Sequence, residues 1–154
     1  MIRKSSPLLT VLLVMACVAP ASAALERTAS PRFRHYTTRD GLASNVLSGD
    51  IFQDSKGYMW FPTNNGLSWY DGARFRSFYA DVRDSNALLS PVVDAITEDA
   101  DGDLWVTVSG ALMHLDRRSM TLTRAFVYGD SLDDVGALCF DEGAGVLYLG
   151  HTNG

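Results

Sequence analysis

The feature that most constrains the fold of this chain is an internal repeat with a period of 45 residues. Residues 51–60 (IFQDSKGYMW) recur as residues 96–105 (ITEDADGDLW), with an offset of 45 at every position. A third, weaker copy begins at Leu138 and continues to Tyr148, with one additional residue in its turn. Repetition at a fixed period of this length indicates an array of equivalent structural units, each of which packs on its neighbours.

Every copy combines short apolar or alternating runs with closely spaced turn signals. The tetrads 54–57 and 99–102 both start with Asp, which can cap its own turn, and end with Gly, which tolerates a positive φ. The stretches 64–66 (NNG) and 71–72 (DG) are further hairpin signals. Four short strands in a repeat of this length are typical of a β-propeller blade. We therefore predict an all-β fold of four-stranded β-propeller blades in an incomplete ring, because closed rings have at least four blades.

The repeat divides the chain into predicted segments. Residues 24–44 form an N-terminal segment, 45–88 and 89–131 two complete blades, and 132–154 a truncated third blade. Residues 32–36 (RFRHY) match residues 74–78 (RFRSF), which end the first full copy. Propellers can close their ring with an N-terminal strand that completes the last blade, because this removes two free sheet edges. We expect residues 32–36 to be such a ring-closing strand, paired with a blade outside this chain.

The first 23 residues have the pattern of a cleaved secretory signal. Arg3 and Lys4 form a short positive region, and residues 8–19 form a mostly apolar run. This run is too short to cross a bilayer, which takes about 20 helical residues, and the small residues 21–23 (ASA) fit a signal-peptidase site. We predict a signal peptide, 1–23, and a periplasmic mature protein. Lipoprotein processing at Cys17 is the alternative.

Composition excludes several classes of function. The chain has 13 Lys and Arg residues against 18 Asp and Glu residues, a net charge of −5. Nucleic acid is therefore not an expected partner, since phosphate neutralisation requires clustered basic residues. The 2 cysteines cannot support a disulfide-rich scaffold, and loss of the signal would leave Cys139 alone. We expect Cys139 to be a small buried residue of a strand.

Three motifs carry a resemblance to a known family. They are residues 36–46 (YTTRDGLASNV), 53–61 (QDSKGYMWF) and 66–72 (GLSWYDG). Together they resemble the two-component regulator propeller repeat, found in periplasmic sensor regions of bacterial hybrid histidine kinases and some diguanylate cyclases. The resemblance covers nearly all of residues 33–154 and implies a sensor region of one or two propellers, followed by a further β domain, a membrane helix and a signalling output. Pro62 stands where the family usually has Gly, and residues 106–108 (VTV) lack the usual Gly-Thr, so we expect a distorted hairpin there.

The residues that recur between copies are interpreted as structural. We expect the recurrent aromatic residues to pack each blade against the next, with sugar stacking as the alternative, and the Asp and Gly residues to form turns. These structural repeat residues are Asp54, Gly57, Trp60, Asp99, Gly102, Trp105 and Tyr148. A calcium loop at 99–103 is disfavoured because its twelfth position is Gly110. Each of the 3 histidines stands singly, so no catalytic residue, metal site or cofactor is predicted.

The loops between successive copies are the predicted ligand-binding region. In each of them an Asp precedes a Leu, and propeller ligands bind over the central channel, where such loops converge. The candidate ligand-binding residues are Asp40, Ser44, Asn45, Asp84 and Asp130. The alternative is that the Asp starts a turn while the Leu fills the top of the blade.

These features predict the N-terminal part of a periplasmic, ligand-sensing β-propeller from a bacterial signal-transduction protein. The expected partners are a small ligand, with a carbohydrate as one candidate, and the remaining blades of the same parent chain. The membrane would be reached only through a missing C-terminal segment of an inner-membrane parent. No enzymatic activity is expected of these residues, although the missing part could carry histidine kinase or diguanylate cyclase activity. A fragment of a polysaccharide-active propeller enzyme and a non-signalling propeller scaffold are the alternatives.

Overall fold

A computed structural model describes residues 32–127 and 135–151 of the chain. The chain divides into two compact units, residues 1–34 and 35–154, and every element named below belongs to the second. The described residues contain ten β-strands and one short 3-10 helix, η1 (Thr38–Asp40), but no α-helix. Nor do they contain any helix of the length and apolarity that a membrane span needs. The predicted signal peptide, 1–23, lies outside the described residues.

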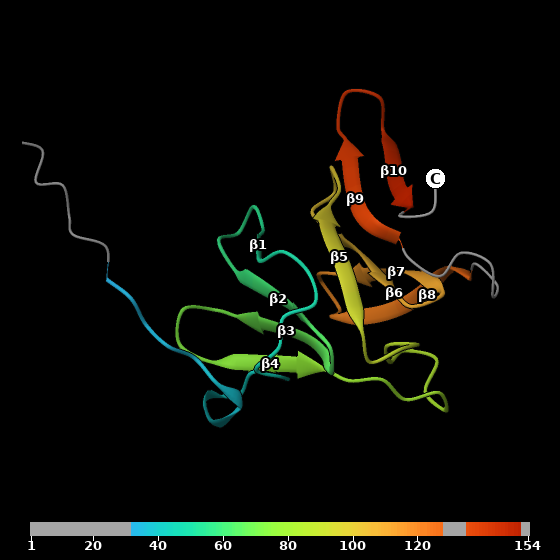
Figure 1. The fold of residues 1–154 in the computed structure, drawn as a ribbon. Helices are drawn as coiled ribbons and strands as arrows, with labels where there is room; N and C mark the ends of the chain where they lie inside the picture. The colour runs from blue at the N-terminus through green and yellow to red at the C-terminus, as the bar shows by residue number, and fades with distance from the viewer. Residues whose placement is uncertain (1–31, 128–134, 152–154) are drawn as a thin grey trace, which may run out of the picture. The chain divides into compact units, whose positions relative to one another are not determined.

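The first copy of the repeat folds into a four-stranded antiparallel sheet. Its strands are β1 (Phe52–Gln53), β2 (Met59–Thr63), β3 (Gly66–Tyr70) and β4 (Phe75–Phe78), and they follow one another in space as in sequence (Figure 1). The β1–β2 turn closes with a hydrogen bond of 2.9 Å from the amide of Gly57 to the carbonyl of Asp54. Gly57 has a φ of +84°, a conformation that an L side chain rarely adopts. The turn predicted at residues 54–57 is therefore present in the structure.

The second copy repeats this topology. Its strands are β5 (Val93–Glu98), β6 (Leu104–Val108), β7 (Ala111–Asp116) and β8 (Thr121–Val127), again antiparallel and in sequential order. The third copy contributes a hairpin of β9 (Val135–Asp141) and β10 (Val146–His151). The predicted all-β fold of four-stranded sheets is confirmed, and the described strands form three separate sheets rather than one closed sheet.

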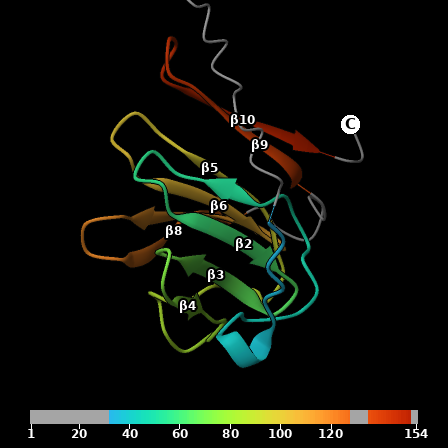
Figure 2. The ribbon, with the colours of Figure 1, turned by 90° about the vertical axis from the view of Figure 1, so that its left-hand side faces the viewer.

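The sheets fall within the predicted blade segments. The first sheet lies inside 45–88, the second inside 89–131 and the hairpin inside 132–154, while the segment limits themselves stay predictions. Residues 32–36 have no regular secondary structure. Their expected strand partner belongs to a blade outside this chain, so the ring-closing strand also stays a prediction. Figure 2 shows η1 beside β4, where the hydroxyl of Ser77 donates to the carbonyl of Gly41 at 3.2 Å.

The expectation of a distorted hairpin at Pro62 is wrong. Pro62 pairs with Leu67, and the β2–β3 register runs without a shift from Met59 to Thr63. The carbonyl of Pro62 faces the chain before β1, since it accepts the amide of Ser48 at 3.1 Å. In a strand the N–H of a residue points to the same side as its carbonyl, so the donor that proline lacks would also face that neighbour. The missing donor thus lies on the side away from β3, and the β2–β3 ladder loses no hydrogen bond.

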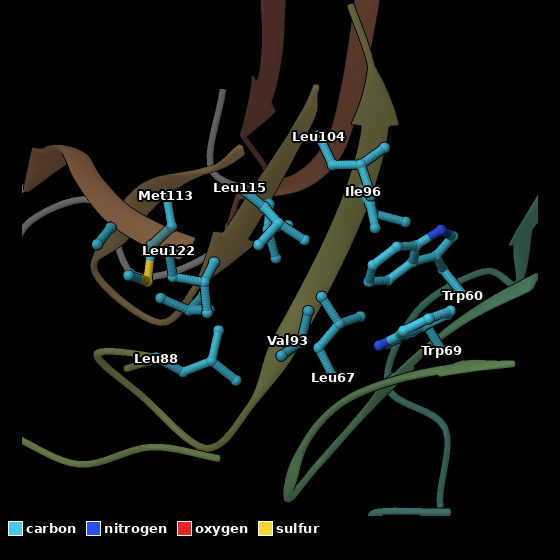
Figure 3. Packing of buried hydrophobic residues seen from close by; sticks show 13 residues of the cluster. Trp60, Leu67, Trp69, Leu88, Val93, Ile96, Leu104, Met113, Leu115 and Leu122 are labelled. Carbon is cyan, nitrogen blue, oxygen red and sulfur yellow. The ribbon is translucent and has the colours of Figure 1, made fainter. Parts of the chain in front are cut away.

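The main hydrophobic core lies between the first two sheets. Trp60, Leu67 and Trp69 of the first sheet pack in one buried cluster with residues of the second sheet (Figure 3). The contributions of the second sheet include Val93 and Ile96 from β5, and Trp60 and Trp69 are stacked with ring centroids 5.9 Å apart. The recurrent aromatic residue of the first copy therefore packs one sheet against the next, as expected for neighbouring repeat units.

Cys139 differs from its expected buried position, because its side chain is exposed. The hairpin β9–β10 carries mostly exposed or half-buried residues, in contrast to β6, where four of five residues are buried. Among the described residues, β9 and β10 have neither a third nor a fourth strand beside them. The apolar strand pattern identified the strand correctly, but burial depends on neighbouring strands that the hairpin lacks.

Candidate functional site

The same carboxylate–indole arrangement recurs in the first turn of both sheets. In the first sheet, Asp54 Oδ1 accepts the amides of Lys56 and Tyr58, both at 2.9 Å, while Oδ2 accepts the indole N–H of Trp60 at 2.7 Å. The carboxylate thus holds its own turn with one oxygen and fixes the tryptophan of β2 with the other. A charged acceptor makes such hydrogen bonds stronger than those between neutral groups.

Asp99 and Trp105 repeat this geometry in the second sheet. Asp99 Oδ1 accepts the amides of Asp101 and Asp103 at 3.0 Å, and Oδ2 accepts the indole N–H of Trp105 at 2.8 Å. The third copy keeps only the turn: Asp141 Oδ1 accepts the amides of Gly143 and Ala144, at 2.9 and 3.1 Å. Tyr148, the aromatic residue of that copy, is 56% exposed.

A basic residue of the second sheet completes the arrangement at Asp54. Arg117, in the β7–β8 turn, donates from Nη1 to Asp54 Oδ2, and the exposed fractions of the two side chains are only 3% and 0%. Its guanidinium carbon lies 5.0 Å from the ring centroid of Trp60 and 5.5 Å from that of Tyr58. We call this set of Asp54, Trp60 and Arg117 the clasp. It links the two sheets through a buried ion pair and a cation–π contact.

The electrostatics of the clasp favour the ionised carboxylate. Burial by itself raises the pKa of Asp54, but hydrogen bonds from Trp60, Arg117 and the amide of Tyr58 more than offset this effect. The positive charge of Arg117 acts in the same direction, so the pKa of Asp54 lies below its ordinary value of 3.8. At neutral pH the carboxylate of Asp54 and the guanidinium of Arg117 therefore form a buried ion pair.

Sequence reasoning missed Arg117. In the repeat register its counterpart in the first copy is Gly72, so no comparison of copies could reveal it. The Asp–Trp hydrogen bond did leave a signal, because the spacing from Asp54 to Trp60 equals that from Asp99 to Trp105. A constant spacing between an acceptor and an indole donor could have suggested the bond.

Two further contacts join the first two sheets. Glu98 of β5 accepts the amide of Ser55 at 2.7 Å through Oε2 and its hydroxyl at 2.7 Å through Oε1. The hydroxyl of Ser48 donates to the carbonyl of Val93 at 2.6 Å. Gly49 lies so close that a Cβ built on it would be 2.1 Å from the carbonyl oxygen of Asp94. The chain that leads into β1 therefore runs in direct backbone contact with β5.

A groove of about 520 Å³ runs along the first strands of all three copies. Its walls are segments 48–52, 94–97 and 136–139, which occupy equivalent places in the repeat. The lining includes two acidic residues, Asp50 and Asp94, and the exposed Ile51. The lining has more polar than apolar surface, so the groove suits a polar small molecule rather than an apolar one.

The predicted ligand-binding residues that the structure describes are engaged in their own loops. Asp40 accepts the amide of Thr37 at 2.8 Å, and Asn45 accepts that of Thr38 at 2.8 Å, so these two residues meet around η1. Ser44 accepts the amide of Val46 at 3.1 Å. Asp84, in a separate loop, accepts the amide of Asn86 at 2.9 Å.

In these contacts the four residues stabilise turns, which is the alternative to ligand binding given above. None of Asp40, Ser44, Asn45 and Asp84 belongs to the lining of the groove, and Asp130 lies outside the described residues. Their binding of a ligand stays a prediction. Leu42 and Leu88, which follow Asp40 and Asp84, are both buried.

Comparison with known proteins bears on the fold. A structure of the extracellular domain assigned to the one component system BT4673 from B. thetaiotaomicron matches with a TM-score of 0.54 at 19% identity, over 78% of this chain and 18% of that chain. This match shows the fold. A second structure, in which BT4673 is assigned to a hybrid two component system, matches with a TM-score of 0.49 at 23% identity, over 70% of this chain and 15% of that one.

The extracellular domain assigned to the hybrid two component system BT3049 from B. thetaiotaomicron matches with a TM-score of 0.41 at 20% identity, over 77% of this chain and 24% of that chain. This chain thus spans less than a quarter of the length of each of these structures. No family model matches the chain. A search of curated proteins also finds no match.

Proposed function

We propose that this chain is the N-terminal part of an extracytoplasmic sensor β-propeller, whose parent protein binds a small ligand and signals through a membrane-anchored output. The observation that carries the proposal is the groove, because equivalent segments of three successive repeats, at or directly before their first strands, line it together. In a propeller the first strand of each blade lines the central channel, which is where a ligand can contact several blades at once.

The arrangement of the sheets supports the same proposal. Consecutive four-stranded sheets pack through a hydrophobic core and the clasp, which is the way blades meet in a ring. The remaining blades would come from the same parent chain. The likeness of fold to the extracellular domain assigned to a one component system agrees with a sensor outside the cytoplasm. The candidate signal peptide, 1–23, agrees with export.

The ligand class follows from the lining of the groove. Its lining has more polar than apolar surface and includes the acidic residues Asp50 and Asp94. Carboxylates and backbone groups bind hydroxyl and ammonium groups through hydrogen bonds. A neutral or cationic polar molecule, such as a small carbohydrate, is therefore the proposed ligand.

A polysaccharide-active propeller enzyme is the second candidate. The two carboxylates in the groove favour it to a limited degree, since glycoside hydrolysis uses a pair of acidic residues. The proposed sensor requires only that these acidic residues bind a ligand, which their place in the groove supports. The sensor therefore remains the better supported function.

The reading frame downstream of codon 154 tests this proposal. We expect it to continue with further repeats, then a membrane helix and a histidine kinase or diguanylate cyclase domain. A stop codon directly after the last residue would contradict the sensor proposal for this chain. A glycan-cleaving domain in the same frame would favour the enzyme instead.

A further inference from the structure

We propose that Asp99 and Trp105 form a second clasp, which receives the guanidinium of an arginine from the next blade. The inference rests on the proposed function in one respect, that the second sheet has a complete further blade as its neighbour. It assigns to the interface between those blades a specific chemistry: a planar cation that enters beside a tryptophan and pairs with the carboxylate of Asp99.

The first clasp provides the occupied example. There the arginine comes from the third turn of the following sheet, between β7 and β8, and reaches back to the first turn of the preceding sheet. Asp54 Oδ2 accepts two donors at once, the indole N–H of Trp60 and Nη1 of Arg117. A buried carboxylate needs such a partner, because an unpaired buried charge is strongly unfavourable.

Asp99 presents the same pair of acceptor oxygens, although it is half-buried where Asp54 is buried. Its Oδ1 holds the turn and its Oδ2 holds the indole N–H of Trp105, with distances within 0.1 Å of those at Asp54. Among residues 32–127 and 135–151, no Lys, Arg or His forms an ion pair with Asp99. The element that would supply one, the third turn of the next sheet, is absent there, since β9 and β10 are only its first two strands.

The surroundings of Asp99 suit a cation. A hollow of about 210 Å³ lies beside Asp99, and its lining includes the acidic residues Glu98 and Glu142, although the carboxylate of Glu98 already accepts two hydrogen bonds from Ser55. Trp105 is only partly buried, whereas Trp60, beneath Arg117, has no exposed surface. Trp105 packs against His114 and against an apolar cluster that includes residues of β9 and β10, but it keeps exposed surface that Trp60 does not have.

Arginine fits this position better than lysine. A guanidinium is planar, so it can stack on an indole ring while its N–H groups donate in the plane to a carboxylate. An ammonium group is a compact and strongly hydrated charge that gains less from the ring. The proposed partner is therefore an arginine at the position of the next repeat that corresponds to Arg117.

The test uses the chain as it exists, with N-acetyl-arginine amide as the probe. Indole N–H signals of the tryptophans are followed by ¹⁵N NMR during titration to tens of millimolar, with N-acetyl-lysine amide as the matched cation. We expect the arginine probe to shift the Trp105 signal. The Trp60 signal should not change, because Arg117 already covers that ring. The lysine probe should cause a smaller shift.

Two variants locate the effect. Asp99→Asn should abolish the Trp105 shift, whereas Asp101→Asn, an exposed position in the same turn, should retain it. Three outcomes would overturn the inference: an unmoved Trp105 signal, equal responses of Trp60 and Trp105, or equal effects of the two probes. All three can be measured on the wild-type chain. The result is independent of the downstream reading frame, so failure here and failure of the sensor proposal are distinguishable.

Discussion

Arg117 donates a hydrogen bond to Asp54 across 63 residues of sequence, from the third turn of one sheet to the first turn of the sheet before it. Both side chains are buried, and the guanidinium also lies over the ring of Trp60. The two residues therefore connect consecutive repeats through a buried ion pair.

Replacement of Arg117 by Gln should lower the free energy of unfolding by about 3–5 kcal/mol, because it leaves the carboxylate of Asp54 buried without its cation. Chemical denaturation followed by tryptophan fluorescence measures this change. Arg118→Gln is the matched control, since Arg118 is exposed in the same turn and should change stability by less than about 0.5 kcal/mol. Equal effects of the two substitutions would show that the clasp does not stabilise the fold.

Acid should weaken the fold through Asp54. The pKa of Asp54 in the folded chain lies below 3.8, so the unfolded chain binds more protons in this range and stability falls as the pH drops below about 4. We expect the unfolding free energy to decrease more between about pH 6 and pH 3 in the wild type than in Asp54→Asn. Asp71, Asp81 and Asp116, whose pKa values are also lowered, remain in both proteins. An identical decrease in both would contradict the assigned role of Asp54.

Gly49→Ala should destabilise the contact between the first two sheets. The added Cβ would lie 2.1 Å from the carbonyl oxygen of Asp94, so the backbone must move, at a cost of about 1–3 kcal/mol. Gly143→Ala is the control, because its Cβ would lie 3.3 Å from a carboxylate oxygen of the exposed Asp141 side chain. Thermal unfolding compares the two variants. If Gly143→Ala lowered the Tm as much as Gly49→Ala, the close approach would not matter.

Export should produce a mature protein that begins at Ala24. The short apolar run and the small residues 21–23 favour signal-peptidase cleavage at that point. N-terminal sequencing of the protein from a periplasmic extract measures the start directly. An intact Met1 would contradict export, and a lipid-modified Cys17 would replace the predicted cleavage by lipoprotein processing.

The sequence predicted the features of the fold that are local. Asp-Gly and Asn-Gly turns and the 45-residue offset define strands and their order, because turn chemistry depends on a few adjacent residues. The regular hairpin at Pro62 and the exposed Cys139 could not be predicted in this way. The first depends on the side of β2 that the backbone of Pro62 faces, and the second on strands that do not cover the β9–β10 hairpin.

The sequence predicted less of the candidate site. The groove is formed by equivalent strand segments, none of which carries a distinctive motif, so only their placement together reveals it. Arg117 stands where the first copy has Gly72, and its partner is set by the packing of two sheets. The loop residues Asp40 and Asp84 have a residue type that serves both turns and ligands, and their contacts in the structure are turn contacts.

The most direct test of the central claim is an experimental structure of the complete extracytoplasmic region of the parent protein. The account predicts that residues 45–131 form consecutive blades of a closed ring, that the groove faces its central channel, and that an arginine of the third blade contacts Asp99. A structure in which the first two sheets do not belong to a ring of blades would contradict it. So would a closed ring in which the groove faces away from the channel.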